Sequence, residues 1–176
     1  MVTISRPIEY ILRSFKFVKF MLNFDVLIIG SGLAGLSTAL KLAKQKKIAI
    51  ISKRKLADSS SHWAQGGIAA AISDDDSPKS HIQDTEIAGA GLCDPEVTKL
   101  VVENGKKALN WLTKTGVNFT KDSNNKKLHL TQEGGHSHKR IAHVADTTGR
   151  AIQDQLIESV LAHPNIQIFE DHIAVD

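Results

Sequence analysis

Three glycines near the start of the chain have the spacing of a phosphate-binding turn. Gly30, Gly32 and Gly35 follow the pattern G-x-G-x-x-G. In that pattern the first glycine permits a tight turn, the second lets a pyrophosphate approach the backbone, and the third lets a helix pack against a strand. The free N–H groups and the positive dipole end of the following helix favour an anion. The spacing predicts a dinucleotide cradle; an ordinary strand–helix turn is the alternative.

The residues on either side of these glycines favour the cradle. The apolar run Val26–Ile29 precedes the turn and the run Ile48–Ile51 follows it, as expected for parallel strands buried on both faces. Between them, apolar residues recur at helical spacing while lysines occupy the other face. These apolar positions are Leu33, Leu36, Leu40 and Ala43. We therefore expect an α/β domain of Rossmann type with a central parallel sheet.

The end of the second predicted strand departs from the usual dinucleotide pattern. An acidic residue ordinarily follows that strand and binds the ribose hydroxyls, whereas this chain has Ser52 and Lys53. A serine hydroxyl can hydrogen-bond a ribose oxygen, and a lysine can contact a phosphate. The two residues predict nucleotide binding through a variant of the usual contacts.

Two glycine pairs mark further candidate binding segments. Gly66-Gly67 lies within HWAQGGIAA and Gly134-Gly135 within HLTQEGGHSHKR. Paired glycines let the backbone approach something flat or charged, although plain turns have them too. Polar side chains that could bind a ligand flank both pairs: Ser59, Ser60, Ser61, His62 and Gln65 beside the first, and Gln132, Glu133, His136, His138 and Arg140 beside the second.

The histidines around the second pair could suggest a metal site. His136, His138 and His143 have no cysteine or acidic cluster at ligand spacing, and His-x-His alone is a weak signal, so we expect no metal. We expect them instead to act as hydrogen-bond donors near a carboxylate substrate. Arg140 would either assist them or pair structurally with Glu133.

Helix and strand patterns continue to the end of the sequence. Helices are predicted over Ser80–Ala90 and about Glu96–Thr115, the second with Asp94 as N-cap, Pro95 in its first turn and Gly116 after it. Further along we expect a hairpin at 117–130 with its turn at 122–127, a helix at about 148–162, and strands at 166–169 and 173–175. A doubly wound domain needs more strands, so the sheet is expected to be incomplete at the C-terminus, as in a piece of a longer protein.

Charge and composition limit the classes of partner. The net charge of +3 comes from residues 1–22, and the rest of the chain is balanced, so nucleic acid is not indicated. For that N-terminal extension, disorder, a short helix and a targeting peptide all stay open, but it is too charged to span a membrane. The single cysteine, Cys93, excludes an internal disulfide and fits a reducing compartment such as the cytoplasm.

Four motifs in a fixed order indicate a family resemblance. GSGLAG, SSSHWAQGGIAA, DTEIAGAGLCD and HLTQEGGHSHKRIAHVADTTGR resemble the L-aspartate oxidase family, within the superfamily of succinate dehydrogenase and fumarate reductase flavoprotein subunits. The resemblance runs from about Phe24 to Asp176. It implies a partial FAD-binding domain at residues 23–176, without the capping and C-terminal helical domains that the family has in addition.

The resemblance also implies a cofactor and its site. Residues Ser31–Ala34 would surround the FAD pyrophosphate, Ser52 and Lys53 would lie by the adenosine part, and residues Ser60–Gly67 would surround the flavin. The implied cofactor-binding residues are Gly30, Ser31, Gly32, Leu33, Ala34, Gly35, Ser52, Lys53, Ser60, Ser61, His62, Trp63, Ala64, Gln65, Gly66 and Gly67. Membrane-bound superfamily members tether FAD to a histidine six residues before the glycine pair. This chain has Ser60 there, so we expect non-covalent FAD.

Glu133 resembles the glutamate with which the family orients its substrate. A carboxylate at this place would favour aspartate, because aspartate carries an ammonium group that succinate and fumarate lack. A salt bridge of Glu133 with Lys139 or Arg140 is the structural alternative. The resemblance implies oxidation of L-aspartate to iminoaspartate, the first step of NAD biosynthesis, with oxygen or fumarate as electron acceptor and quinolinate synthase as the downstream enzyme.

Two other functions stay open at this point. One is a flavoprotein of the fumarate reductase or succinate dehydrogenase type, against which Ser60 and Glu133 both argue. The other is a flavin-binding fragment without catalysis. In the family, the proton-shuttling arginine and most of the carboxylate clamps lie in the capping domain and later segments, so the 176 residues alone are expected to be inactive.

Overall fold

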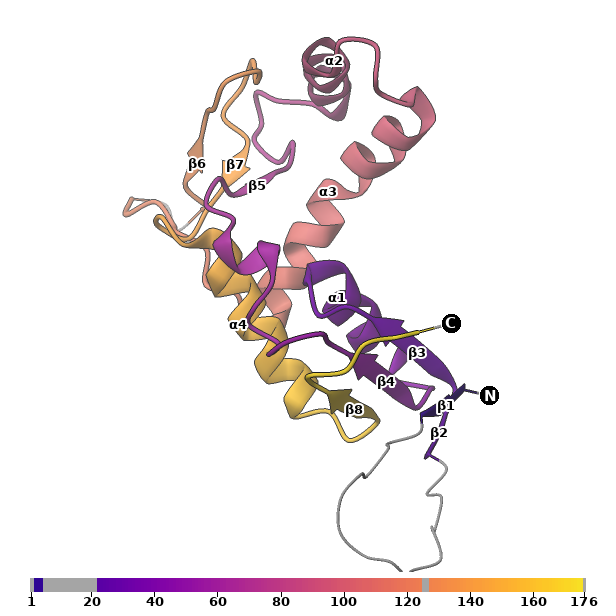
Figure 1. Ribbon diagram of the computed structural model, residues 1–176. Coiled ribbons are helices and arrows are strands. Elements are labelled where there is room, and N and C mark those ends of the chain that lie inside the picture. The colour runs from indigo at the N-terminus through magenta and orange to yellow at the C-terminus, as the bar shows by residue number, and fades with distance from the viewer. Residues whose placement is uncertain (1, 5–21, 125–126, 176) are drawn as a thin grey trace, which may run out of the picture. The chain divides into compact units, whose positions relative to one another are not determined.

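The computed structural model describes residues 2–4, 22–124 and 127–175 (Figure 1). The chain divides into two compact units. Unit 1 consists of residues 1–58 and 156–176, and unit 2 of residues 59–155. Each unit has its own sheet, and each is described by itself below.

Unit 1 is built on a parallel sheet. β3 (Val26–Ile29), β4 (Ile48–Ile51) and β8 (Ile166–Phe169) lie in the order β3-β4-β8, with the first residues of the three strands opposite one another. The central strand β4 is buried along its whole length, which accounts for its purely apolar sequence. α1 (Leu33–Leu42) contacts β3 and β4 and buries Leu36 completely. The predicted α/β fold with a parallel sheet is confirmed.

A second pair of strands adds to the core of unit 1. β1 (Val2–Ile4) pairs antiparallel with β2 (Leu22–Phe24). Phe24 packs its ring edge against Phe169, with centroids 5.8 Å apart, and so joins the apolar cluster around β4 and β8. Residues 5–21, most of the predicted N-terminal extension, lie outside the described residues, and the expectation of disorder or a helix there stays a prediction.

Unit 2 combines a small antiparallel sheet with two packed helices. Its strands β5 (Ile68–Ala69), β7 (Ile141–Ala142) and β6 (Leu130–Thr131) lie in the order β5-β7-β6. The helices α2 (Pro78–Gly89) and α3 (Pro95–Thr115) contact each other. α4 (Thr148–Leu161) begins in unit 2 and ends in unit 1.

The helix ends follow the local sequence. The Asp94 side chain accepts hydrogen bonds from the backbone N–H groups of Glu96 and Val97, and Gly116 ends α3 with φ +115°, so both predicted ends of this helix are confirmed. α2 begins at Pro78, two residues earlier than expected. The reason is that Ser77 caps it, its hydroxyl accepting from the N–H of Ser80.

Of the two predictions for residues 117–130 and 173–175, the first is confirmed and the second was wrong. The chain folds back at 117–130 as predicted, through a bridge between Lys121 and Leu128, although residues 125–126 of its turn lie outside the described part. The predicted strand 173–175 was wrong. In the described structure these residues pair with no strand, and Ile173 and Val175 are 67% and 91% exposed, because apolar residues form a strand only where a neighbouring strand accepts their hydrogen bonds. None of the described helices is long and apolar enough to cross a membrane.

Candidate cofactor and substrate site

The glycine turn between β3 and α1 has the close approach that its spacing predicts. Gly30 has φ +111° and donates its N–H to the carbonyl of Ile51 at 2.9 Å, which ties the turn to the end of β4. A Cβ on Gly35 would overlap the carbonyl oxygen of Gly30. Only glycine therefore lets α1 start this close to β3, with its first N–H groups turned toward the end of the sheet. This is the arrangement that a pyrophosphate needs.

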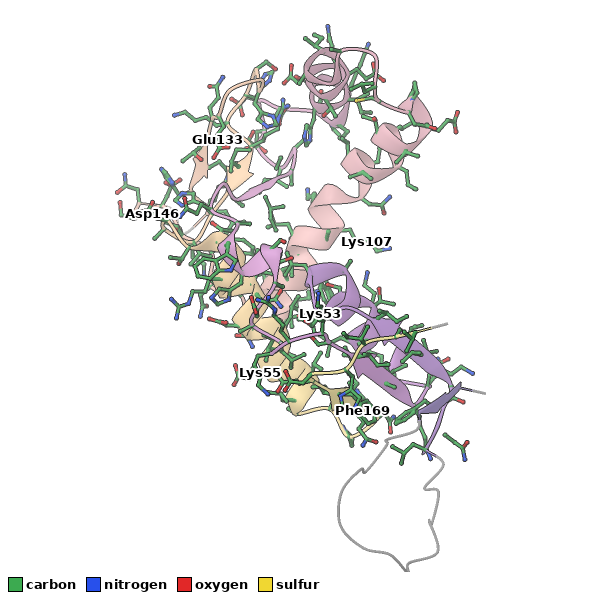
Figure 2. The ribbon with its side chains drawn as sticks, viewed as in Figure 1. Lys53, Lys55, Lys107, Glu133, Asp146 and Phe169 are labelled. Atoms are coloured by element: carbon green, nitrogen blue, oxygen red, sulfur yellow. The ribbon has the colours of Figure 1, made fainter. Side chains whose placement is uncertain are left out.

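Ser52 couples the end of β4 to this turn. Its hydroxyl lies 2.9 Å from the hydroxyl of Ser31, and both side chains are buried. Its backbone N–H and carbonyl are also used, by Phe169 and His172. Lys53 follows on the surface and belongs to none of the ion pairs formed among the described side chains (Figure 2). A phosphate contact by Lys53 stays a prediction.

The predicted flavin segment begins with a single turn of 3-10 helix, Ser60–Trp63. The start of α4 holds this turn in place. Gly149 donates its N–H to the carbonyl of Ala64 at 2.9 Å, and a Cβ on Gly149 would overlap the carbonyl oxygens of Ser61 and Ala64. Sequence reasoning missed Gly149. Its only signal was a glycine in the first turn of a predicted helix, where glycine costs stability unless close packing requires it.

Two buried polar atoms beside the 3-10 turn lack a hydrogen bond among the described residues. The Ser59 hydroxyl and His62 Nδ1 are buried without a hydrogen bond within the described structure, and the nearest carboxylate oxygen to His62 Nδ1, on Asp154, lies 3.7 Å away. Buried polar groups are nearly always hydrogen-bonded. These two atoms fit a ligand at this segment. Trp63 is 75% exposed and offers a flat apolar surface beside them.

The first glycine pair, Gly66-Gly67, lies beside β7 and Glu133 in unit 2. A Cβ on Gly67 would lie 2.6 Å from Ile141 Cγ2 and 2.8 Å from the Ala142 oxygen, so Gly67 permits β5 to approach β7. A Cβ on Gly66 would lie 3.6 Å and 3.9 Å from the two carboxylate oxygens of Glu133. The Glu133 carboxylate therefore lies over the Gly66 backbone. The structure brings the predicted substrate-orienting residue directly to the predicted flavin segment.

Glu133 is carried by the exposed loop that connects β6 to β7 (Figure 2). The structural alternative, a pair of Arg140 with Glu133, was wrong. Arg140 is fully buried and forms its ion pairs with Asp76 at 2.8 Å and Asp84 at 2.7 Å. Because the Arg140 guanidinium is buried and bound by these two carboxylates, it is not free to bind a substrate. The alternative for Glu133, a salt bridge to Lys139, is likewise absent from the ion pairs of the described side chains.

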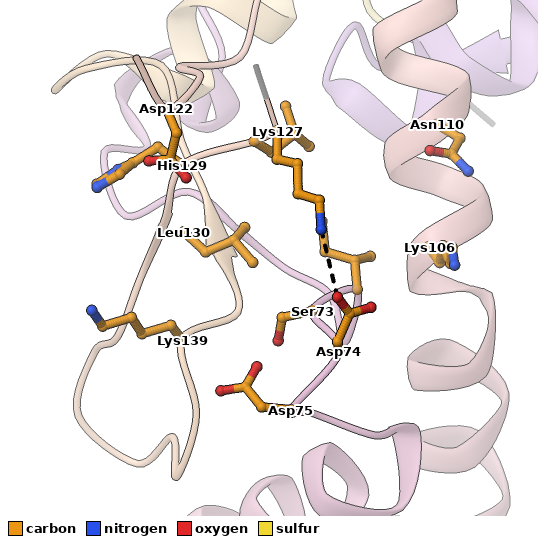
Figure 3. A pocket seen from close by; sticks show the side chains of 12 residues that line it. Ser73, Asp74, Asp75, Lys106, Asn110, Asp122, Lys127, His129, Leu130 and Lys139 are labelled. Atoms are coloured by element: carbon orange, nitrogen blue, oxygen red, sulfur yellow. Dashed lines mark hydrogen bonds and ion pairs between the residues drawn. The ribbon is translucent and has the colours of Figure 1, made fainter. Parts of the chain in front are cut away.

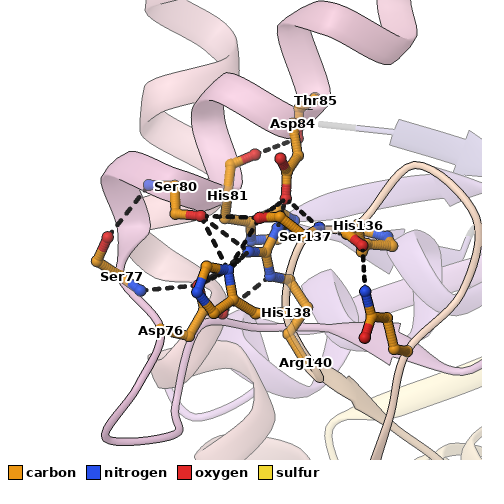
Figure 4. Close-up of polar contacts among 11 residues, drawn as sticks. Asp76, Ser77, Ser80, His81, Asp84, Thr85, His136, Ser137, His138 and Arg140 are labelled. Atoms are coloured by element: carbon orange, nitrogen blue, oxygen red, sulfur yellow. Dashed lines mark hydrogen bonds and ion pairs between the residues drawn. The ribbon is translucent and has the colours of Figure 1, made fainter.

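The Arg140 environment is a dense polar cluster between α2 and the β6–β7 loop (Figure 4). Asp76 accepts two hydrogen bonds from Arg140, both of 2.8 Å. Asp84 accepts one from Arg140 and two from Ser137, from its N–H and its hydroxyl, both at 2.8 Å. The Ser137 hydrogen bonds, together with Arg140, lower the pKa of Asp84 from 3.8 to about 2. Asp84 is therefore a carboxylate at any physiological pH.

The same cluster affects the histidines. Burial, followed by the charges of Arg140 and His136, lowers the pKa of His81 below its ordinary 6.5. Since arginine only donates, the 3.3 Å contact between its Nη1 and His136 Nδ1 makes that nitrogen the acceptor. His143 lies elsewhere and hydrogen-bonds His129 at 2.8 Å. Among the described residues no group of three or more histidine, cysteine or acidic side chains could hold a metal ion.

A cavity of about 830 Å³ opens on another side of the β6–β7 region (Figure 3). Lysines and aspartates from separate segments face it, among them Lys106 of α3, Lys139 and Asp75. Lys127 and Asp74 make an ion pair of 3.5 Å across it, with the Asp74 side chain 98% exposed. Its charges are of both signs and largely exposed, so water and salt weaken the interactions between them. Sequence analysis did not indicate this cavity, and none of the predicted site residues lines it.

Comparison with known proteins identifies the family. The sequence model of a family described as FAD binding domain matches residues 25–176. The chain belongs to this family of FAD-binding domains. FAD is accordingly its cofactor. The glycine turn, the close approach at Gly35 and the polar atoms of Ser59 and His62 that lack a hydrogen bond in the described structure fit such a group.

Named relatives make the resemblance more specific. The chain is 53% identical over 156 residues to L-aspartate oxidase 1 of Ralstonia nicotianae, covering 88% of this chain and 29% of the relative. It is 46% identical over 155 residues to the chloroplastic L-aspartate oxidase 2-a of Nicotiana tabacum, covering 87% of this chain and 24% of that one. The chain thus spans less than a third of the length of these curated relatives.

Solved structures agree with the fold. A mutant of the E. coli quinol fumarate reductase FrdA matches with a TM-score of 0.83 at 31% identity, over 87% of this chain and 26% of that chain. The Mycobacterium smegmatis Sdh1 complex matches with a TM-score of 0.78 at 27% identity, over 84% of this chain and 27% of that chain. The chain is thus similar to the FAD-binding part of flavoprotein oxidoreductases.

Proposed function

We propose that this chain is the FAD-binding part of an L-aspartate oxidase. The observation that carries the proposal is the position of the Glu133 carboxylate over Gly66, where a Cβ would lie 3.6 Å from it. A carboxylate close to the predicted flavin segment supports a site that prefers a substrate with an ammonium group. The identities of 46% to 53% with proteins named L-aspartate oxidase support the same assignment.

In this proposal each described residue has a limited task. The glycine turn holds the pyrophosphate, Lys53 lies by the adenosine part, and the 3-10 turn at Ser60–Trp63 lies against the flavin. When bound, FAD supplies the acceptor for two electrons from the substrate Cα. Glu133 attracts the substrate ammonium and so orients the Cα–H bond, while its negative charge adds nothing to the binding of succinate.

Non-covalent attachment is part of the proposal. The position that carries the tethering histidine in membrane-bound relatives is occupied here by Ser60. His62 lies close by, but its Nδ1 is buried next to Asp154. Acid precipitation of the purified holoprotein tests this directly. We expect the flavin absorbance to appear in the supernatant; flavin that stays with the pellet would contradict non-covalent binding.

The substrate assignment is tested by hydrogen peroxide production with oxygen as acceptor. Because the chain spans 29% of the Ralstonia nicotianae relative, turnover is measured on this chain joined to the remainder of that relative. We expect peroxide from L-aspartate and little from succinate. Glu133→Gln should lower kcat/KM for aspartate by about ten- to a hundredfold, the worth of one charge-assisted hydrogen bond. Equal turnover of succinate would instead favour a dicarboxylate dehydrogenase of the fumarate reductase type.

Three finer parts of the proposal concern the cell. We propose that the product iminoaspartate enters NAD biosynthesis, where quinolinate synthase would consume it, and that fumarate can replace oxygen as acceptor. We also propose the cytoplasm as the compartment, supported by the single cysteine, Cys93. For the 176 residues alone we propose FAD binding without full turnover, because the relatives need more than three times this length.

A further inference from the structure

The loop that carries Glu133 is exposed, yet it has a fixed shape. Residues 132–135 are all exposed to solvent, as are Ser137 and Lys139. At the base of the loop the Arg140 N–H donates to the Thr131 carbonyl at 3.1 Å. At its tip the His136 N–H donates to the Glu133 carbonyl at 3.2 Å, across Gly135 with φ +83°. These bonds define a closed turn but do not attach it to anything else.

One carboxylate oxygen attaches the loop to helix α2. Asp84 Oδ2 accepts from the Ser137 N–H, the Ser137 hydroxyl and Arg140 Nη1, at 2.8, 2.8 and 2.7 Å. Ser80, one turn earlier on α2, adds a hydroxyl contact to Ser137 at 3.1 Å. Asp84 thus binds the loop at two places, at Ser137 near its tip and at Arg140 at its base (Figure 4).

The ion pair between Asp84 and Arg140 is stronger than an exposed ion pair. Arg140 is fully buried, and the Asp84 side chain is only 13% exposed, so water does not screen their 2.7 Å ion pair as it would on the surface. Asp76 takes the other edge of the guanidinium through two bonds of 2.8 Å. The guanidinium of Arg140 is therefore held in one orientation. The loop backbone at Arg140 is restrained with it.

We infer that Asp84 is a positioning residue, which holds the Glu133 carboxylate over Gly66 by fixing Ser137 and Arg140. Glu133 is the fourth residue before Ser137, and the turn between them is closed by the His136 bond. Gln132 strengthens that turn, because its side-chain amide donates to the His136 carbonyl at 2.7 Å. A shift at Ser137 is thereby transmitted to Glu133. The inference rests on the proposed role of Glu133 in substrate choice.

Hydrogen exchange on the intact chain with FAD tests the physical part. Asp84→Ala removes the acceptor, and we expect the Ser137 amide and its neighbours in 133–136 to exchange about ten- to a hundredfold faster. Asp84→Asn keeps one acceptor oxygen and should restore part of the protection. Asp74→Asn, in an exposed ion pair of the same unit, serves as the matched control and should leave the loop unchanged. Unchanged exchange in Asp84→Ala would overturn the inference.

A double-mutant cycle tests the functional part, on the fusion with the Ralstonia remainder. We expect Asp84→Ala to lower the preference for aspartate over succinate, mainly through KM, and Asp84→Asn to restore part of it. In a Glu133→Gln background the same change should have no further effect, because Asp84 acts through Glu133. Effects that add independently would mean general destabilisation and would overturn the inference.

Two further outcomes separate this inference from the proposed function. If Glu133→Gln leaves the substrate preference unchanged, the proposed role of Glu133 fails, and Asp84 loses its role in substrate choice with it, whatever the exchange data show. If Asp84→Ala does not fold, Ser137→Ala takes its place, since it removes the hydroxyl bond to Asp84 and leaves the Arg140 ion pair intact. Normal preference and normal exchange in Ser137→Ala would then overturn the inference.

Discussion

The glycine turn of unit 1 and the Glu133 loop of unit 2 are held by different forces. The turn depends on space: Gly35 lies against the Gly30 carbonyl, and the neutral hydroxyls of Ser31 and Ser52 close it. The loop depends on charge, through Arg140 and its two buried carboxylates. Nothing lies within 4 Å of a Cβ placed on Gly134, which lies in the loop itself. We therefore expect the turn to be sensitive to added volume and the loop to lost charge.

The largest expected effect is the loss of charge beneath the loop. Arg140→Met would leave Asp76 and Asp84 buried without their partner, and breaking a buried ion pair typically costs about 3–5 kcal/mol. Urea unfolding measures the loss. Arg54→Met is the matched control, because its pair with Asp58 is exposed and should cost less than about 1 kcal/mol. Equal losses in the two variants would show that the buried cluster contributes no special stability.

Added volume in the turn should have the next largest effect. Gly35→Ala forces a Cβ onto the Gly30 carbonyl, and overpacking of this kind typically costs about 1–3 kcal/mol. FAD affinity, measured by flavin fluorescence, should fall together with stability, because α1 must move away from β3. Gly105→Ala, in α3, is the control, since its Cβ would make only ordinary contacts with Ala69 and Ala70 and alanine favours helix. Undiminished FAD binding in Gly35→Ala would contradict a tight approach of helix and strand.

The same contrast explains what could be predicted from sequence. The turn depends on glycine spacing and apolar runs that lie within one short stretch, so β3, β4 and the turn itself were predicted correctly. The partners of Arg140 are 56 and 64 positions away, and only the packing of α2 against the loop brings them together. From sequence only Glu133, which is near in the chain, could be offered as an alternative partner. Gly149 was missed for the same reason, as its contact at Ala64 is distant in sequence.

Lowering the pH should weaken the Glu133 loop more than the glycine turn. The pKa of Asp84 is lowered to about 2 in the folded chain against 3.8 ordinarily, so its stabilising contribution is full above about pH 4 and is lost as the pH falls toward 2. His81, with its pKa lowered below 6.5, also makes the fold less stable as the pH falls below 6.5.

Unfolding measured between pH 7 and pH 2 isolates the Asp84 contribution. Asp84→Asn should be less stable than the parent chain at pH 7, and the two stabilities should converge toward pH 2, because the parent then carries a protonated Asp84. Hydrogen exchange should report this convergence in unit 2 and leave the β3–β4 amides unaffected. Two parallel stability curves would contradict the lowered pKa.

The smallest expected effect concerns the hydroxyl pair that closes the turn. Ser52→Ala removes the 2.9 Å contact to Ser31 and should cost about 0.5–1.5 kcal/mol, the net worth of one neutral hydrogen bond. This loss should not vary between pH 7 and pH 4, in contrast to the loss in Asp84→Asn, because neither hydroxyl titrates. Ser123→Ala, on the exposed turn of unit 2, provides the baseline. A strongly pH-dependent loss in Ser52→Ala would show that charge also holds the turn, and the contrast between the two regions would then be wrong.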